Sequence, residues 1–279
     1  MNLFNLMHGG IKKDPRIMHL TQNDRILLGD GLFETLRFEN QQLIYPQKHW
    51  QRLCQSAIQL SIPIPMDYQE WSASILNCIK STNLNTGGVK VILSAGDAPR
   101  GLELTGQNPY FLFQAFTYLS SLKPYTLIKA DWLRDKNNPL YQMKSVNYLE
   151  AILARRSVQA KGADDALFFN TDNFATETTT ANLFIIQSNQ ILTPTLSCGV
   201  LPGIIRQRIL DISRKEGIEC YEAKIDHQTI TEADMLFTSN ALQGLRPVAR
   251  FGATKFNLKS ALFTYLQDLI KQDQREYAS

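Results

Sequence analysis

Two adjoining segments decide the fold, K-S-V-N-Y-L-E-A-I-L-A-R-R at residues 144–156 and G-A-D-D-A-L-F-F-N-T-D-N-F-A-T-E-T-T-T-A-N-L-F at residues 162–184. The first predicts a helix with apolar residues at helical spacing, which Lys144 opens. The second predicts a buried strand and then a hairpin that carries Glu177 back toward the helix. Together they bring one amine and one carboxylate to the same region of the fold.

Strand and helix patterns alternate through the first half of the chain. In chain order they predict a strand, a return strand, two helices and two more strands, at residues 32–38, 43–45, 46–60, 68–80, 89–96 and 110–116. The last of these strands is almost wholly apolar, so we expect it at the centre of its sheet. This order of elements indicates an α/β sandwich.

The second half of the chain follows a linker candidate at residues 119–124. In addition to the helix that Lys144 is expected to open, the patterns predict helices and strands at residues 125–130, 166–170, 174 onward, 182–187, 203–217, 219–223, 235–238 and 258–272. With 279 residues the chain is long enough for two cores. We therefore expect two α/β domains, a smaller one at 1–118 and a larger one at 125–279.

Composition excludes several classes of protein. The chain is 44% hydrophobic and 20% charged, and its net charge of +3 comes from scattered basic residues, which does not favour nucleic-acid binding. The N-terminus lacks the pattern of a signal peptide, and no apolar run approaches the roughly 20 residues of a membrane span. Cys54, Cys78, Cys198 and Cys220 are far apart, which indicates reduced thiols in a cytoplasmic protein, and no metal site is predicted.

Five short segments carry a family resemblance. They are G-D-G-L-F-E-T at 29–35, H-W-Q-R-L at 49–53, K-S-V-N-Y-L at 144–149, E-T-T-T-A-N-L-F at 177–184 and L-P-G-I-I-R at 201–206. Each segment alone has a plain structural explanation, such as a surface lysine or a helix start. In this order, however, they resemble the class IV, or fold-type IV, pyridoxal-phosphate enzymes. That family includes branched-chain aminotransferases, D-amino acid aminotransferases and 4-amino-4-deoxychorismate lyases.

The resemblance implies the fold-type IV architecture, with pyridoxal 5′-phosphate bound between the two domains. It implies that Lys144 is the Schiff-base lysine and, once freed, the catalytic base and acid. Glu177 would hold the proton on the ring nitrogen, which lets the ring withdraw electrons. Tyr148 resembles the residue that binds the phenolate oxygen of the cofactor, although it could equally be a core tyrosine.

The phosphate contacts implied by the resemblance are Arg52 and the backbone N–H groups of Ile204 and Ile205 at a helix N-terminus. Two departures make this site leaner than in the branched-chain enzymes. Ile205 stands where the family often has serine or threonine. Asn240 and Ala241 lie near the last core strand, and Ala241 has no hydroxyl where aminotransferases often carry a phosphate-binding threonine.

Two further segments resemble the lyases in particular. Asn240, Ala241 and Leu242 match their N-A-L segment, and S-A-G-D-A-P-R-G at 94–101 resembles their S-R-G-x-G-x-R-G loop, without its first arginine. Arg100 of that loop is a candidate for binding a substrate carboxylate, or else a solvated arginine at a hairpin tip.

The expected function is therefore that of a 4-amino-4-deoxychorismate lyase of folate biosynthesis, which releases 4-aminobenzoate and pyruvate. Thr35 is a candidate proton shuttle, although threonine in a strand is usually structural. One alternative is an aminotransferase acting on D- or branched-chain amino acids, and another is a non-catalytic protein that binds the cofactor. The resemblance also implies a small-molecule amino substrate and a homodimer whose active sites borrow residues from the neighbouring subunit.

Overall fold

The computed structural model describes residues 21–102, 106–119 and 123–277. Residues 1–20, on which the expectation about a signal peptide rests, and residues 120–122 of the expected linker lie outside this part. The helices are α1 (Pro46–Gln59), α2 (Tyr68–Lys80), α3 (Leu149–Ala160), α4 (Ile204–Lys215), α5 (His227–Thr231) and α6 (Ala261–Glu276), with short 3-10 helices η1 (Arg25–Leu28), η2 (Pro139–Gln142) and η3 (Leu196–Cys198). The strands are β1 (Gly31–Glu39), β2 (Gln42–Leu43), β3 (Gly87–Ser94), β4 (Tyr110–Phe116), β5 (Tyr125–Arg134), β6 (Asp165–Asn170), β7 (Ala175–Thr178), β8 (Asn182–Gln187), β9 (Gln190–Pro194), β10 (Cys220–Ala223), β11 (Met235–Asn240), β12 (Gly244–Phe251) and β13 (Thr254–Lys255).

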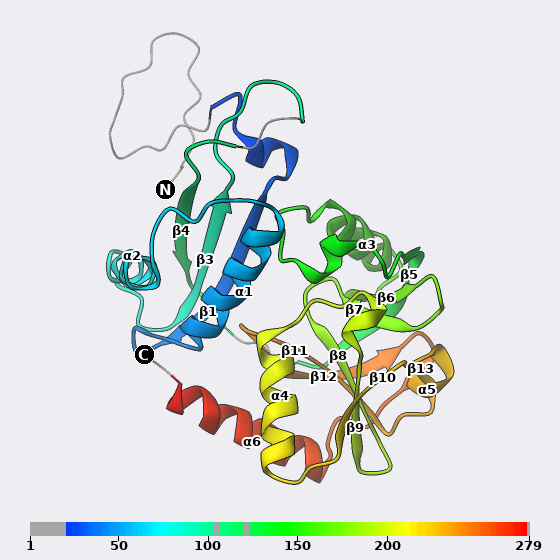
Figure 1. Cartoon of the computed structure of the whole chain (residues 1–279). Helices are drawn as coiled ribbons and strands as arrows, with labels where there is room; N and C mark the ends of the chain where they lie inside the picture. The colour runs from blue at the N-terminus through cyan, green and yellow to red at the C-terminus, as the bar shows by residue number, and fades with distance from the viewer. Residues whose placement is uncertain (1–20, 103–105, 120–122, 278–279) are drawn as a thin grey trace.

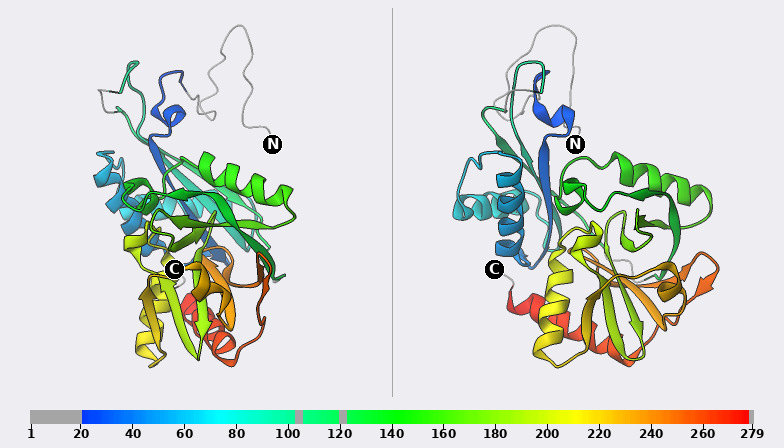
Figure 2. Two further views of the ribbon diagram at one scale, coloured as in Figure 1. Left: turned by 90° about the vertical axis from the view of Figure 1, so that its right-hand side faces the viewer. Right: turned by 45° about the vertical axis from the view of Figure 1, so that its right-hand side comes forward.

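The first sheet contains four antiparallel strands in the order β2-β1-β3-β4. Helices α1 and α2 pack on one of its faces, and the C-terminal part of the chain lies on the other (Figure 2). The apolar faces of the sheet and the two helices form a core around the fully buried Trp71. Asp67 and Glu70 form a capping box that starts α2.

The second sheet has nine strands and closes on itself. Its strand order is β10-β9-β8-β11-β12-β5-β6-β7, with β13 beside β12. Because β7 also pairs with β8, through Glu177 and Asn182, six of the strands form a closed ring. Helix α3 packs on β5 and β6, while α4 and α6 pack on each other and on β11 and β12 (Figure 1). The predicted α/β fold class is therefore confirmed.

We infer two domains, 1–118 and 125–279, joined by the linker at 119–124. In support, the first sheet with α1 and α2 comes from residues 31–116, and the second sheet comes from residues 125–255. The two parts also have separate apolar cores.

The strand at 110–116 is an edge strand, so the prediction that it is central is wrong. Its apolar composition reflects cover on both of its faces. Phe111 and Phe113 pack on the core beneath α2, whereas Phe116 lies against Gly88 on the opposite face. An apolar strand shows that both faces are covered and does not show how many strands flank it.

Lys144 does not open a helix, contrary to the prediction, because α3 begins at Leu149. The lysine lies in an extended segment that docks on β1. Its carbonyl accepts from the N–H of Phe33 at 2.8 Å, and the N–H of Val146 donates to the carbonyl of Gly31 at 3.0 Å. These bonds occupy backbone groups that an earlier helix would need, so the helix starts only where the segment leaves β1.

Several elements differ from the sequence-based expectation. Strands β9, β12 and β13 and helix α5 are not predicted, and in β12 the apolar alternation is interrupted by Pro247 and two arginines. The last helix begins at Ala261 rather than near Leu258, because the Ser260 side chain caps it by accepting from the N–H of Phe263. The return strand ends at Leu43, because Tyr45 takes a left-handed conformation before α1.

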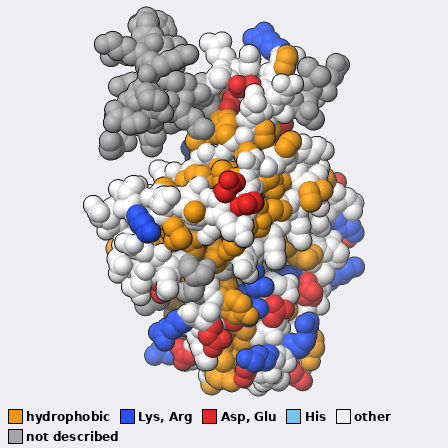
Figure 3. Space-filling model, turned by 60° about the vertical axis from the view of Figure 1, so that its left-hand side comes forward, with side chains coloured by type: hydrophobic (Ala, Val, Ile, Leu, Met, Phe, Trp, Pro, Cys, Tyr) orange, Lys and Arg blue, Asp and Glu red, His pale blue; other side chains and the backbone are white. Residues whose placement is uncertain are grey.

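The surface carries charges of both signs. On the face seen in Figure 3, basic and acidic side chains are interleaved over the lower part of the molecule. In the part of the chain that the structure describes, no helix is both long enough and apolar enough to cross a membrane.

Candidate active site

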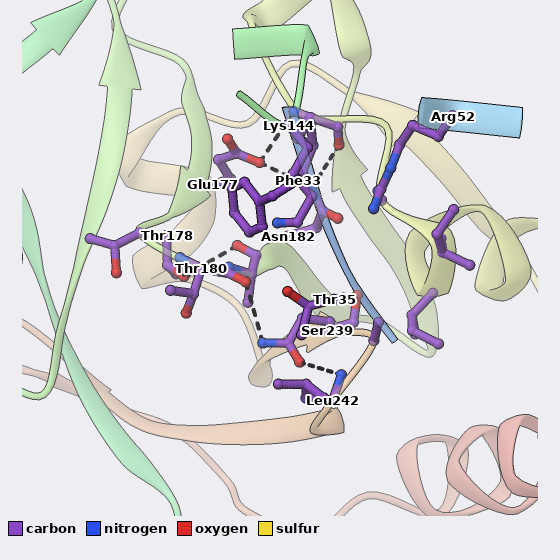
Figure 4. Close-up of a pocket in the computed structure, with 18 of the residues that line it drawn as sticks. Phe33, Thr35, Arg52, Lys144, Glu177, Thr178, Thr180, Asn182, Ser239 and Leu242 are labelled. Atoms are coloured by element: carbon purple, nitrogen blue, oxygen red, sulfur yellow. Dashed lines mark hydrogen bonds between the residues drawn. The ribbon is translucent and has the colours of Figure 1, made fainter. Parts of the chain in front are cut away.

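A cavity of about 210 Å³ lies between the two sheets (Figure 4). Nine of the ten residues predicted for the site line this cavity, namely Thr35, Arg52, Lys144, Tyr148, Glu177, Ile204, Ile205, Asn240 and Ala241. The tenth, Arg100, is exposed and does not line it. The structure therefore brings together residues that are more than 200 positions apart in the chain.

The Lys144 amine is buried in the wall of the cavity. Its Nζ lies 3.4 Å from the hydroxyl of Tyr148 and 4.3 Å from the centroid of the Phe33 ring. Burial lowers the pKa of this amine to about 8, and the nearby Arg52 guanidinium contributes to the decrease. Near neutral pH a larger fraction of the amine is therefore unprotonated and nucleophilic than in an ordinary lysine.

Tyr148 lies directly before α3 and turns its hydroxyl toward Lys144. Its ring meets the Phe33 ring edge-on, with 5.0 Å between the centroids. Burial, and then the charge of Glu177, raise the pKa of the hydroxyl to about 12. The hydroxyl therefore stays protonated near neutral pH and can donate a hydrogen bond into the cavity.

Glu177 lies on β7, and three donors hold its carboxylate. The side-chain amide of Asn182 and the backbone N–H of Leu201 each donate to Oε2 at 3.2 Å, and Arg134 Nη1 donates to Oε1 at 3.3 Å. Burial raises the pKa of this carboxyl group, and Arg134 is the main group that opposes the rise. The donors favour the ionised carboxylate, which is the form that can accept a proton from a ligand.

Arg134, on β5, is a site residue that the sequence analysis missed. Its Nε donates to Glu150 Oε2 at 3.0 Å. The guanidinium carbon lies 3.5 Å from the centroid of the Phe168 ring and 4.6 Å from that of the Tyr141 ring. The sequence gives no specific signal for it, because Arg134 lies beyond the strand predicted at residues 125–130, and basic residues in such positions are common on protein surfaces.

Arg52 projects from α1 and is anchored by a buried carboxylate that the sequence analysis also missed. Its Nε and Nη2 donate to the two oxygens of Glu34 at 2.8 and 2.6 Å, and Nη1 donates to the carbonyl of Pro202 at 3.1 Å. His49 Nδ1 lies 2.6 Å from the same carboxylate. Burial raises the pKa of Glu34, but the charges and hydrogen bonds of Arg52 and His49 together have the larger effect and lower it to about 2. Glu34 is therefore ionised, and the guanidinium keeps N–H groups free for a ligand.

Helix α4 points its N-terminus at the cavity. Gly203 is the N-cap and has no side chain that could accept from the first N–H groups, and Ile204 and Ile205 follow it. A Cβ atom at Gly203 would lie 1.9 Å from Asn182 Oδ1, so only glycine fits there. The N–H groups of the first turn are therefore free to bind an anion along the helix dipole.

A turn after β11 closes another side of the cavity. The Asn240 side chain accepts from the N–H groups of Leu242 and Gln243 at 3.1 and 2.8 Å, which places Ala241 at the cavity wall. The neighbouring Ser239 is buried, and within the described residues its hydroxyl has no hydrogen-bond partner. Thr35, across the cavity on β1, likewise has no hydrogen-bond partner for its hydroxyl in this part of the chain.

These residues fit pyridoxal 5′-phosphate. The cofactor needs an amine for its aldehyde, a carboxylate for its ring nitrogen and a site for its phosphate. Lys144 and Glu177, which both line the cavity, could supply the first two (Figure 4). The α4 N-terminus and Arg52 could provide the third, and Gly203 before α4 leaves room for the Asn182 side chain at that end of the cavity.

Comparison with known proteins agrees with this geometry. The model of the amino-transferase class IV family matches residues 31–251. A solved structure from Legionella pneumophila, provisionally described as a 4-amino-4-deoxychorismate lyase, is 44% identical, covers 93% of this chain and 97% of its own, and superposes with a TM-score of 0.91.

Two curated relatives are more distant. The aminodeoxychorismate lyase of Vibrio harveyi is 28% identical over 84% of this chain and 88% of its own length. The D-alanine aminotransferase of Bacillus licheniformis is 25% identical over 79% of this chain and 78% of its own length. Because the family model spans most of the chain, this protein belongs to the class IV aminotransferase family, whose cofactor is pyridoxal 5′-phosphate.

Proposed function

We propose that this chain is a 4-amino-4-deoxychorismate lyase of folate biosynthesis. The observation that carries the proposal is the 44% identity, over nearly the whole chain, to the Legionella protein, compared with 25% to the D-alanine aminotransferase. The Asn240-Ala241-Leu242 turn at the cavity wall supports it, because this segment resembles the lyases. The curated lyase and aminotransferase relatives are similar in identity and do not decide between the two reactions.

In the proposed reaction the substrate loses the proton on the carbon that bears its amine, and the bond from the ring to the enolpyruvyl oxygen breaks. The ring becomes aromatic as 4-aminobenzoate, and the leaving group takes up a proton and becomes pyruvate. Bound pyridoxal phosphate supplies the electron sink for this proton loss. Lys144 would hold the cofactor, and its amine, once freed, would remove the proton.

The other residues position and exchange protons. Glu177 would keep the ring nitrogen of the cofactor protonated, and Tyr148 would donate a hydrogen bond to the oxygen on its ring. The unpartnered hydroxyl of Thr35 faces the same cavity, where it can pass a proton to the leaving enolpyruvyl group. Arg52 and the N–H groups of Ile204 and Ile205 bind the phosphate, and the turn at Asn240 and Ala241 contributes backbone groups.

Attachment of the cofactor to Lys144 can be tested directly. Borohydride reduction followed by peptide mapping should place the pyridoxyl group on Lys144, and Lys144→Ala should abolish turnover. A pyridoxyl group on any other lysine would remove Lys144 from this role.

One assay tests the reaction. The purified protein should release 4-aminobenzoate and pyruvate from aminodeoxychorismate without any added 2-oxo acid. The alternative is an aminotransferase, so D-alanine and L-leucine with 2-oxoglutarate are tested in parallel. Efficient amino transfer without release of 4-aminobenzoate would refute the lyase proposal. A cofactor absorbance that responds to none of these amines would instead favour a non-catalytic binding protein.

We also propose a homodimer in the cytoplasm. Leu149, Ile152 and Leu153 expose an apolar stripe on one face of α3, close to the lysine segment, which is the pattern of an unpartnered interface. Arg100 is exposed and does not line the cavity of its own chain, so its proposed role as a substrate contact would require the cavity of the neighbouring chain. The four cysteines are all free thiols, which supports a reducing compartment. Light scattering tests the dimer, and a fully active monomer would exclude it.

A further inference from the structure

Lys90 is a half-buried cation beside the cavity. It lies on β3 directly opposite Thr35 of β1, and residues opposed in this way project from the same face of a sheet. Lys90 therefore lies on the face that Thr35 presents to the cavity. Its amine is 4.9 Å from the centroid of the Phe33 ring, which forms part of the cavity wall.

The amines of Lys90 and Lys144 are close to each other. Both lie against the Phe33 ring, at 4.9 and 4.3 Å from its centroid. They are therefore at most about 9 Å apart, near enough to repel each other where little water separates them. Burial and Arg52 lower the pKa of Lys144 most, and Lys90 adds to that decrease.

Lys90 also differs from the two arginines of the site. Arg52 is paired with Glu34, and Arg134 with Glu150 and Glu177. In contrast, no carboxylate within the described residues forms an ion pair with Lys90. A half-buried ammonium group without a counter-charge lowers stability unless a ligand supplies that charge. Lys90 therefore carries a positive charge beside the cavity that remains available for an anionic ligand.

We propose that Lys90 binds the ring carboxylate of the substrate. This inference rests on the proposed lyase function, whose substrate carries an amine and a carboxylate at opposite positions of a six-membered ring. When the amine takes the place of the Lys144 amine, the carboxylate points to the far side of the ring. Both amines lie against the Phe33 ring, so the apolar ring of the substrate lies beside Phe33 and its carboxylate reaches Lys90.

A pair of ligands that differ in one charge tests this role. The product 4-aminobenzoate keeps the amine and the carboxylate, whereas 4-aminobenzamide is a neutral molecule of nearly the same shape. Calorimetric titration of the holoenzyme should show that Lys90→Met weakens binding of 4-aminobenzoate at least about tenfold, the effect of losing one charge-assisted contact. Binding of 4-aminobenzamide should change less than twofold, and Lys90→Arg should restore most of the affinity for the acid.

The chain offers a matched control in Lys129. This lysine is also half-buried and also lies against an aromatic ring, 4.5 Å from the centroid of Phe169, but that ring, unlike Phe33, does not line the cavity. Lys129→Met should leave the binding of both ligands unchanged.

The possible outcomes separate this inference from the proposed function. If Lys90→Met binds the acid as well as the parent does, or weakens both ligands equally, Lys90 is not the carboxylate contact, even though the lyase function stands. If the parent neither binds 4-aminobenzoate nor releases it from aminodeoxychorismate, the lyase function fails and the inference fails with it.

Discussion

Replacing the active-site lysine should stabilise the cofactor-free protein. The pKa of the Lys144 amine is lowered from 10.5 to about 8, first by burial and then by Arg52. Each pH unit between these values corresponds to about 1.4 kcal/mol. At pH 7 the folded apoprotein therefore holds this ammonium group at a cost of roughly 3 kcal/mol relative to the unfolded chain. Lys144→Met removes the charge and keeps an apolar stem of similar length.

The sign and the pH window follow from proton linkage. The unfolded chain keeps the lysine proton up to about pH 10.5, whereas the folded chain releases it near pH 8. Unfolding therefore takes up a proton between these values, and the free energy of unfolding of the parent rises with pH across this window. The advantage of Lys144→Met should be roughly 3 kcal/mol at pH 7, about 2 kcal/mol at pH 9 and below about 0.5 kcal/mol at pH 10.5.

The measurement is urea unfolding of both apoproteins at one protein concentration and at these three pH values. Lys215→Met is the control, because that side chain is 79% exposed and its removal should give no such gain. A Lys144→Met variant that is no more stable than the parent at pH 7, or whose advantage does not change with pH, would refute the reasoning.

Three further substitutions test the site. Glu177→Gln should retain the cofactor but lower turnover about 100-fold or more, because a neutral amide cannot keep the ring nitrogen protonated; turnover within a few-fold of the parent would show that Glu177 is not the ring partner. Gly203→Ala should weaken cofactor binding measured by equilibrium dialysis, because its Cβ would lie 1.9 Å from Asn182 Oδ1; an unchanged affinity would contradict the tight fit. Thr35→Val should slow release of pyruvate and leave the affinity for the cofactor unchanged, and an unaffected rate would exclude the proton shuttle.

Local patterns account for much of what the sequence predicts correctly. Helix α2 forms at the predicted residues 68–80, because its apolar residues recur at helical spacing and Asp67 caps it. Gly203 precedes α4 as predicted, and Gly217 follows it with the positive φ expected after a helix end. In these cases the information lies within a few neighbouring residues.

Patterns of this kind cannot show which distant groups become neighbours. The segment of Lys144 reads as the start of a helix, but hydrogen bonds to β1 keep it extended. Glu34 and Arg52 belong to two separate segments, and nothing in either one shows that they form a buried ion pair. The edge position of β4 is hidden for the same reason, since an apolar strand looks alike at the centre of a sheet and at a covered edge.

The sequence by itself therefore determined the class of fold, the family resemblance that implies the cofactor, and nine of the residues that line the cavity. Residue types in a fixed order carry this information, because the cofactor requires an amine, a carboxylate and an anion site. Only the tertiary structure decided how each of these groups is held and charged. Arg134 holds Glu177, Glu34 holds Arg52, and Lys90 lies against Phe33, and in each pair the two residues come from different elements. The pKa values of the site depend on burial and on charges that meet only in the folded chain.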